Sequence, residues 1–161
     1  MAIAADEFRN ALQYWASGVT IVTAQCPSLG FLGMTASSFS SVSMDPPQIL
    51  VCINKDVSTA EAINESGAFA INILTSQQEA ISNLFANPSS YADRFSATMH
   101  EAGKTGAPLL TESLASIECT VVEQVSAASH WIIIGAVQNT VIRPGEPLLY
   151  YKTGYRELNQ C

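Results

Sequence analysis

The pattern of apolar and polar positions predicts a helix near the start of the chain. Phe8, Ala11, Leu12 and Trp15 recur at spacings of three and four residues, which puts them on one face of a helix. Acidic residues precede this face and Gly18 follows it, as is typical of the two ends of a helix. We therefore expect an amphipathic helix in this segment.

Runs of β-branched and aromatic residues bounded by turn residues predict strands along much of the remaining chain. In the run "LASIECTVVEQV", alternation puts Ile117, Cys119, Val121 and Val125 on one face. The next segment, "HWIIIGAVQNTVIR", is its expected hairpin partner. The predicted strands are 19–24, around 30–36, 48–54, 68–75, 114–125 and 130–143, with a short strand within 147–158.

Two further helix starts match a capping box, in which a serine is followed three residues later by glutamate: "STAE" at 58–61 and "SQQE" at 76–79. Residues 87–108 have turn residues and little periodicity, which predicts an excursion over the surface. The order of helices and strands lacks the regular alternation of a parallel sheet. We therefore expect a mainly β fold, an antiparallel barrel with peripheral helices, in a single domain over residues 1–161.

Composition and charge narrow the classes of function. Of the 161 residues, 48% are hydrophobic and only 13% are charged, which predicts apolar surface covered by a second copy of the chain, a homodimer. The net charge of -7 argues against nucleic-acid binding, because a phosphate backbone requires basic side chains. The N-terminus lacks the basic start of a signal peptide, and no apolar run reaches membrane-helix length, so we expect a cytoplasmic protein with no membrane partner.

Several common cofactor and metal motifs are missing. The four cysteines, at 26, 52, 119 and 161, form no CxxC pair, and only two histidines occur, so we expect no metal site. The "GKT" at 103–105 lacks the preceding glycine of a P-loop, and no GxGxxG is present. A nicotinamide cofactor would therefore not be held by a Rossmann turn.

The stretch "GMTASSFSSVS" at 33–43 combines many hydroxyl groups with no charge. Hydroxyl and main-chain N–H groups bind an anion or the edge of a flat heterocycle, although a solvated edge strand would have the same composition. The helix start at Ser58 and Thr59, preceded by Lys55, is a second candidate anion site, and a plain N-cap is its alternative. His130 is expected at the rim of the barrel, in either a structural or a catalytic role.

Several segments occur in a familiar order: "FRNALQYWASGVTIVTA", "GMTASSFSSVSMDPPQILVCIN", "FAINIL", "NLFA", "DRF", "LASIECTVVEQVSAASHWIIIGAV" and "PLLYYKTGYREL". Over residues 8–158 this order resembles the short-chain flavin reductases, the small components of two-component flavin-dependent monooxygenases. The resemblance implies a dimeric, FMN-binding split barrel of the Greek-key type. It also implies hydride transfer from NADH or NADPH to FMN or FAD, and delivery of the reduced flavin to a partner monooxygenase.

The same resemblance implies where the cofactors bind. The flavin is expected at Met34 to Ser41, its phosphate near the start of the helix at Ser58, and the nicotinamide near His130, the implied catalytic residue. The implied cofactor-binding residues are Met34, Thr35, Ala36, Ser37, Ser38, Ser41, Cys52, Asn54, Lys55, Ser58, Thr59, Phe85, Ala86, Arg94, Tyr155 and Arg156.

The chain departs from the family pattern just before His130. Many relatives have Gly-Asp-His where this chain has Ala128, Ser129 and His130. Since alanine adopts positive φ less readily than glycine, we expect an altered loop here. Two alternatives to a reductase follow: a flavin carrier or sensor without reductase activity, and a flavoenzyme that reduces another acceptor, such as a corrinoid or a metal chelate.

Overall fold

The computed structural model describes residues 3–158, so Cys161 lies outside the described residues. The helices in this range are α1 (Ala5–Leu12), α2 (Ser58–Ser66) and α3 (Glu79–Ala86), with 3-10 turns at Ser76–Gln78 and Pro88–Ser90. The strands are β1 (Ser17–Gly18), β2 (Thr20–Cys26), β3 (Gly30–Ala36), β4 (Phe39–Met44), β5 (Pro47–Asn54), β6 (Ala68–Ile73), β7 (His100–Ala102), β8 (Pro108–Leu110), β9 (Ala115–Ala127), β10 (His130–Ile142), β11 (Leu149–Tyr151) and β12 (Gly154–Arg156).

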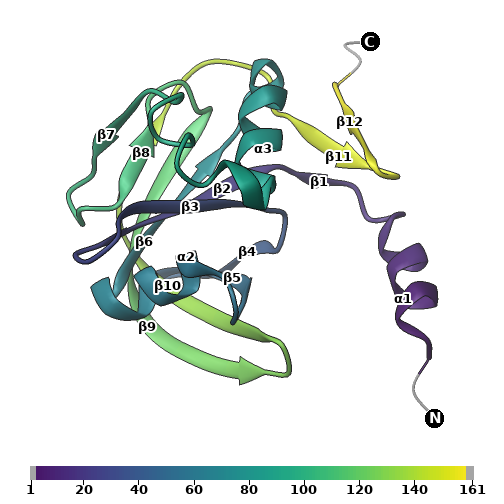
Figure 1. The fold of residues 1–161 in the computed structure, drawn as a ribbon, viewed down its shortest axis with the longest axis horizontal. Helices are drawn as coiled ribbons and strands as arrows, with labels where there is room; N and C mark the ends of the chain where they lie inside the picture. Colours follow the sequence, from purple (N-terminus) through teal and green to yellow (C-terminus); the bar gives the residue numbers. More distant parts are fainter. Residues whose placement is uncertain (1–2, 159–161) are drawn as a thin grey trace.

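A seven-stranded sheet with the order β3-β2-β6-β9-β10-β5-β4 forms the body of the molecule (Figure 1). All of its pairings are antiparallel, and the expected hairpin of β9 with β10 is confirmed. The two edge strands, β3 and β4, follow one another in the chain and are separated only by Ser37 and Ser38. The predicted mainly β fold with antiparallel pairing is therefore confirmed.

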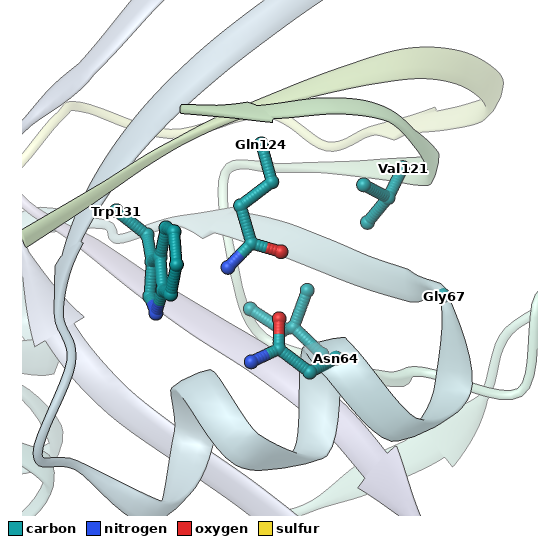
Figure 2. A pocket seen from close by; sticks show the side chains of 6 residues that line it. Asn64, Gly67, Val121, Gln124 and Trp131 are labelled. Carbon is teal, nitrogen blue, oxygen red and sulfur yellow. The ribbon is translucent and has the colours of Figure 1, made fainter. Parts of the chain in front are cut away.

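The β9–β10 hairpin contains a β-bulge that changes which side chains share a face. Glu123 pairs with Ile134 but Val121 pairs with Gly135, so Val122 is the extra residue. The bulge reverses the alternation of side chains, and Gln124 comes to lie on the same side as Val121 (Figure 2). The prediction that Val125 shares the face of Val121 is therefore wrong.

The larger core lies between the sheet and α2, where Val22, Ile53, Ile63 and Phe69 are fully buried. A Cβ atom at Gly135 would lie 2.6 Å from the Phe69 ring, so only glycine lets β10 approach this ring so closely. A second core cluster packs against α3. Its buried members are Val19, Ile21, Leu74, Phe85, Leu110 and Leu148.

Helix α1 projects from the body of the molecule (Figure 1). It ends at Leu12, before the predicted apolar face reaches Trp15, and none of its residues is buried. After α1 the chain enters a small sheet of the order β1-β11-β12. The amphipathic pattern therefore predicted the helix correctly, but its apolar face has no covering surface among residues 3–158.

The two predicted capping boxes are wrong in detail. The N-cap of α2 is Val57, which makes no side-chain cap, so Ser58 is the first helical residue. Before α3 the capping box is formed by Thr75 and Gln78, one residue earlier than predicted. In both places the N-cap lies one residue earlier than the serine of the predicted capping box.

In residues 3–158 no helix combines the length and apolarity needed to cross a membrane. The same range contains no group of three or more His, Cys, Asp or Glu side chains arranged to hold a metal ion. Cys26, Cys52 and Cys119 are free thiols. The cytoplasmic location stays a prediction.

Candidate functional site

A hollow of 380 Å³ opens where β3 ends, and four separate parts of the chain form its walls. Thr35, Ala36 and Ser37 form one side, and none of the lining residues is charged. We refer to it as the Ser37 hollow. Val19 also lines it, and helix α3 and the β11–β12 hairpin supply the other lining residues: Ser82, Asn83, Ala86, Tyr150, Thr153 and Tyr155.

The hydroxyl groups beside this hollow differ in their partners. Thr35 donates a hydrogen bond to the carbonyl of Ser82 at 2.6 Å, and Ser38 donates to the carbonyl of Cys52 at 2.7 Å. These two bonds fasten the ends of β3 and β4 to α3 and β5. The hydroxyl of Ser37 is exposed and has no hydrogen-bond partner within residues 3–158. Of the three, Ser37 is therefore the one whose hydroxyl is free for a ligand.

Cys52 and Asn54 lie beside His130 on the outer face of the sheet. Both alternate along β5 with fully buried residues, and the strand register pairs Asn54 directly with His130. The main-chain N–H of Cys52 donates to the carbonyl of Ser38 at 3.1 Å, which brings the hydroxyl stretch to the same face. Three segments far apart in the sequence thus meet here.

The turn that precedes His130 keeps a glycine-like backbone. Ala128 has a φ of 48°, and a positive φ at the first central position of a two-residue turn is typical of type II′ hairpins, in which glycine is preferred. Alanine adopts this strained conformation at a cost of about 1–2 kcal/mol. That the loop differs from the loop of relatives stays a prediction. Ser129 Oγ lies 2.9 Å from His130 Nδ1 and orients the imidazole ring.

The N-terminus of α2 has unused hydrogen-bonding capacity. The main-chain N–H groups of Ser58 and Thr59 have no acceptor within the helix, because these residues form its first turn. Thr59 is fully buried and its Oγ1 has no partner among the described residues; Thr98 and Ser113 carry similar buried hydroxyl groups elsewhere. N–H groups without an acceptor at the positive end of a helix dipole are suited to bind an anion.

The predicted cation at this end of α2, Lys55, is directed toward the β9–β10 hairpin. Its Nζ donates to Ser126 Oγ at 2.6 Å and lies 4.7 Å from the centre of the Trp131 ring. Its main-chain N–H donates to the carbonyl of Ser129 at 3.0 Å. Lys55 thus joins β5 to the hairpin and would have to leave Ser126 to meet an anion at α2.

Phe85, Ala86 and Arg94 have different surroundings. Phe85 and Arg94 are only 1% and 2% exposed, and Ala86 alone of the three lines the Ser37 hollow. The guanidinium of Arg94 donates to the carbonyls of Gly33 and Asn87, both at 2.7 Å. Arg94 therefore supports the hollow by fixing β3 to the segment that follows α3.

The β11–β12 hairpin closes against α3 through Tyr155. The Tyr155 hydroxyl lies 2.8 Å from Ser82 Oγ and 3.0 Å from Asn83 Oδ1. The other predicted residue of this hairpin, Arg156, is exposed and donates to the carbonyl of Tyr155. Ser82 and Asn83 are site residues that the sequence did not reveal, because small polar residues within a helix form no recognisable motif.

Of the predicted residues, only Thr35, Ala36, Ser37, Ala86 and Tyr155 line the Ser37 hollow. Met34 and Ser41 are two of those that lie outside its lining. Met34 is half-buried and packs against the larger core. Ser41 is exposed on the edge strand β4.

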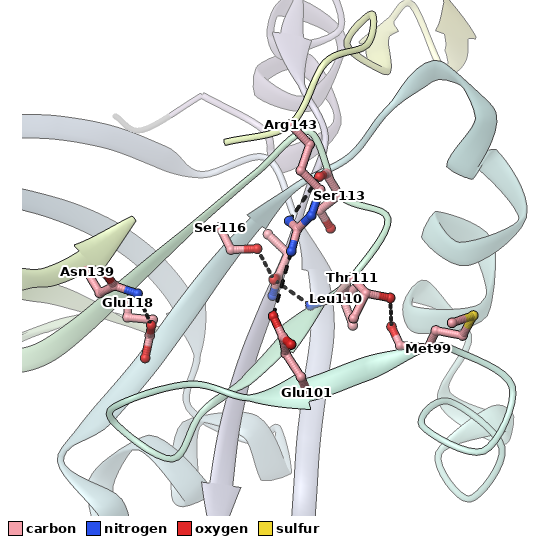
Figure 3. Close-up of polar contacts among 10 residues, drawn as sticks. Met99, Glu101, Leu110, Thr111, Ser113, Ser116, Glu118, Asn139 and Arg143 are labelled. Atoms are coloured by element: carbon pink, nitrogen blue, oxygen red, sulfur yellow. Dashed lines mark hydrogen bonds and ion pairs between the residues drawn. The ribbon is translucent and has the colours of Figure 1, made fainter. Parts of the chain in front are cut away.

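A second polar region, the interior polar cluster, lies within the sheet and comprises Asn72, Ser116, Glu118, Asn139 and Thr105. Asn72 Oδ1 accepts a hydrogen bond from Ser116 at 2.9 Å. Glu118 is 1% exposed and accepts from Asn139 Nδ2 at 2.7 Å (Figure 3) and from the main-chain N–H of Thr105 at 3.0 Å. These groups satisfy one another, which indicates a structural role.

Cys119 lies next to this cluster in the larger core. Burial raises the pKa of its thiol to about 12, and the neighbouring Glu118 carboxylate contributes in the same direction. Since the thiolate is the reactive form of cysteine, Cys119 is chemically inert near neutral pH.

A further hollow of 430 Å³ lies at the C-terminal end of α2 (Figure 2). The carboxamides of Asn64 and Gln124 and the indole of Trp131 surround it. None of the implied cofactor-binding residues lines this hollow, so it is separate from the candidate site.

Comparison with known proteins gives the class to which this fold and site belong. Residues 12–159 match the family described as the flavin reductase like domain. The FMN reductase (NADH) RutF of an Enterobacter species is 36% identical, over 94% of this chain and 92% of the relative. The chain belongs to the flavin reductase family.

Solved structures agree with this assignment. The NADH:FAD oxidoreductase SgcE6 of Streptomyces globisporus has a TM-score of 0.90 and 29% identity, over 99% of this chain and 98% of that one. Nitrilotriacetate monooxygenase component B of Mycobacterium thermoresistibile has a TM-score of 0.89 and 31% identity, over 96% and 86%. The resemblance seen in the sequence is confirmed, and the protein is an oxidoreductase of the flavin reductase type.

Proposed function

We propose that this flavin reductase transfers a hydride from NADH to FMN or FAD bound in and beside the Ser37 hollow. A bound flavin would accept the hydride at N5 from C4 of the nicotinamide. This transfer requires no acid or base at the reacting carbon, so the protein acts by holding the two rings about 3–3.5 Å apart. The observation that carries the proposal is an uncharged hollow with a free hydroxyl, at the end of β3, in a chain of this family.

The residues around the hollow fit a flavin in two respects. Ser37 and the exposed main chain next to it offer neutral donors and acceptors, which suit the polar edge of an isoalloxazine ring. From Cys52 the outer face of β5 extends about 7 Å to its end at Asn54, and α2 begins four residues later. The unused N–H groups at Ser58 and Thr59 would then hold the phosphate, and the orphaned Thr59 hydroxyl supports this assignment.

The names of relatives support NADH as the hydride donor. The relatives described above that name a nicotinamide name NADH. We therefore expect a higher kcat/KM with NADH.

The proposal is tested by following nicotinamide oxidation with each pair of NADH or NADPH and FMN or FAD. Rapid oxidation of NADH with release of the reduced flavin, detected by ultrafiltration, is the expected result. No oxidation with any pair would overturn the proposal in favour of a flavin carrier or sensor. Oxidation with the flavin retained on the protein would instead indicate another acceptor.

The role of His130 is tested by replacing it with alanine. Because His130 lies beside Asn54 at the rim of the sheet and is oriented by Ser129, we expect His130→Ala to raise KM for NADH more than the Kd for FMN. His100→Ala is the matched control, since His100 packs against Phe31 and Phe95 instead. Unchanged kcat and KM in His130→Ala would remove His130 from the mechanism.

We further infer a homodimeric split barrel formed by one domain. Consecutive edge strands β3 and β4 support closure of the sheet into a barrel, and the family match over 12–159 supports a single domain. Phe8 and Leu12 are 55% and 53% exposed, which supports a second copy packed on α1. Phe8→Glu with Leu12→Glu should give monomers in light scattering. A monomeric wild type would contradict the dimer.

The similarity to a monooxygenase component supports a partner oxygenase that receives the reduced flavin. The partner would need no stable complex, because reduced flavin can diffuse between the two proteins. Product formation by a flavin-dependent monooxygenase separated from this protein by a dialysis membrane would support free transfer. Product formed only when both proteins share one compartment would require direct contact.

A further inference from the structure

Trp15 is exposed although the segment that carries it is well fixed. Its side chain is 75% exposed, which is a large loss of apolar burial for an indole. Its main-chain N–H donates to the carbonyl of Leu12 at 3.0 Å, and the carbonyl of Gln13, two residues before it, accepts from the main-chain N–H of Lys152 at 3.0 Å. Directly after it, Ser17 in β1 pairs with β11. The main chain at Trp15 is therefore fixed, and its exposed indole is available to contact a ligand.

Trp15 lines a hollow of 310 Å³ that lies next to the Ser37 hollow. Trp15 and Phe39 supply its aromatic walls, and the small residues Ala16 and Gly18 also line it. Ser37 lines both hollows, so the two are contiguous at this residue. We refer to this hollow as the slot; its aromatic and small lining residues suit a flat apolar ring.

The chemistry of the two hollows matches the two edges of a flavin ring. The pyrimidine edge of the isoalloxazine is rich in hydrogen-bonding groups, whereas the dimethylbenzene edge has only carbon and hydrogen. We propose that Trp15 and Phe39 bind the dimethylbenzene edge while the groups around Ser37 bind the polar edge. This assignment rests on the proposed flavin reductase function, and it makes Trp15 a specificity-determining residue.

The first test measures the Kd for FMN by equilibrium dialysis. Trp15→Ala should weaken FMN binding about tenfold, since an aromatic contact contributes about 0.5–1.5 kcal/mol beyond buried area. Trp15→Phe should restore most of the affinity, and Tyr14→Ala is the matched control, because Tyr14 is also exposed but does not line the slot. Equal affinity of Trp15→Ala and wild type for FMN would overturn the inference.

The second test uses an FMN analogue that lacks both methyl groups of the dimethylbenzene ring. The loss caused by Trp15→Ala should be several-fold smaller for this analogue than for FMN. The emission of bound FMN should rise in Trp15→Ala, because an indole in contact with the ring quenches it, and should stay low in Trp131→Phe. Equal losses for the two flavins, with unchanged emission, would place Trp15 away from the ring.

A third variant fills the slot without removing an aromatic residue. A Cβ atom at Gly18 would meet no atom within 4 Å, so the fold tolerates a side chain there. Gly18→Val should weaken FMN binding while its circular dichroism spectrum and thermal midpoint stay those of the wild type. FMN affinity equal to wild type would contradict a ring in the slot.

Two outcomes distinguish a failure of this inference from a failure of the proposed function. If the wild type binds no flavin, both the proposed function and the inference fail. If FMN binds the wild type but Trp15→Ala changes only the monomer–dimer equilibrium at constant FMN affinity, a second copy covers Trp15 and the inference alone fails.

Discussion

The interior polar cluster and the Ser37 hollow are both rich in uncharged polar groups, yet they differ in where the hydrogen bonds go. In the cluster, Glu118 and Asn72 are buried and are bonded to neighbours on other strands. Beside the hollow, Ser37 is without a partner, and at the start of α2 so is the buried Thr59 Oγ1, among the described residues. Polar residues that satisfy one another fix the fold, whereas the free hydroxyl groups at the candidate site keep their hydrogen-bonding capacity for a ligand.

Arg94 tests this distinction most strongly, because a charged residue was predicted to bind the cofactor and is instead bonded to main-chain carbonyls. Arg94→Met should lower the free energy of unfolding by about 3 kcal/mol, since each hydrogen bond from a charged donor contributes about 1.5–3 kcal/mol. Urea unfolding measures this, and Arg156→Met is the exposed control, with an expected change below about 0.5 kcal/mol. Unchanged stability with weaker FMN binding would indicate that Arg94 binds the cofactor, as the resemblance implied.

The buried thiol of Cys119 should make the stability of the protein depend on pH. The thiol pKa is 9.0 in the unfolded chain and about 12 in the folded one, so the unfolded state loses this proton first as pH rises. Stability from this group is complete below pH 9 and should fall by about 1.4 kcal/mol per pH unit above it, until about pH 12. Cys119→Val should lack this slope in urea unfolding at high pH. If the free energy of unfolding falls with pH equally in the wild type and in Cys119→Val, the raised pKa of the Cys119 thiol is refuted.

Thr59 offers the corresponding test at the candidate site. Thr59→Val removes a hydroxyl that has no internal partner, so stability without ligand should stay equal or rise by about 1 kcal/mol. The Kd for FMN should rise about tenfold, while that for riboflavin, which lacks the phosphate, should not change. Calorimetric titration with both ligands measures this. A loss of stability, or equal losses of affinity for FMN and riboflavin, would show that Thr59 has a structural role and does not bind the phosphate.

The smallest expected effect concerns the turn before His130. Because Ala128 has a φ of 48°, Ala128→Gly should raise the free energy of unfolding by about 0.5–1 kcal/mol. Ala127→Gly, in the paired end of β9, is the control and should lower it by about 0.5–1 kcal/mol. The effect is read from urea unfolding. Destabilisation of both variants would mean that the turn is not strained in solution.

The sequence predicted most strands because their signal is local. Alternation and bounding turn residues gave β2, β3, β5, β6, β9 and β10 to within a few residues. Prediction from the sequence failed where pairing with a neighbouring segment determines the backbone conformation. The bulge at Val122 follows from pairing with β10, and the N-cap at Val57 follows from where β5 ends, and neither has a local signature.

Only those residues of the candidate site that have a local signal in the sequence could be predicted. The run around Ser37 stands out in the sequence as many hydroxyls without charge, and Ser58 and Thr59 stand out as a helix start. Ser82 and Asn83 could not be found, because they meet the hollow only when α3 packs beside β3 and the β11–β12 hairpin closes on them.

The sequence by itself determined the family, the mainly β class and the location of the hydroxyl stretch. Only the tertiary structure decided which hydroxyls are free. Thr35 and Ser38 are used by α3 and β5, while Ser37, between the two edge strands, faces no partner. The physical reason is that a hydroxyl group has one proton to donate, and long-range packing, not local sequence, determines whether an acceptor lies within reach.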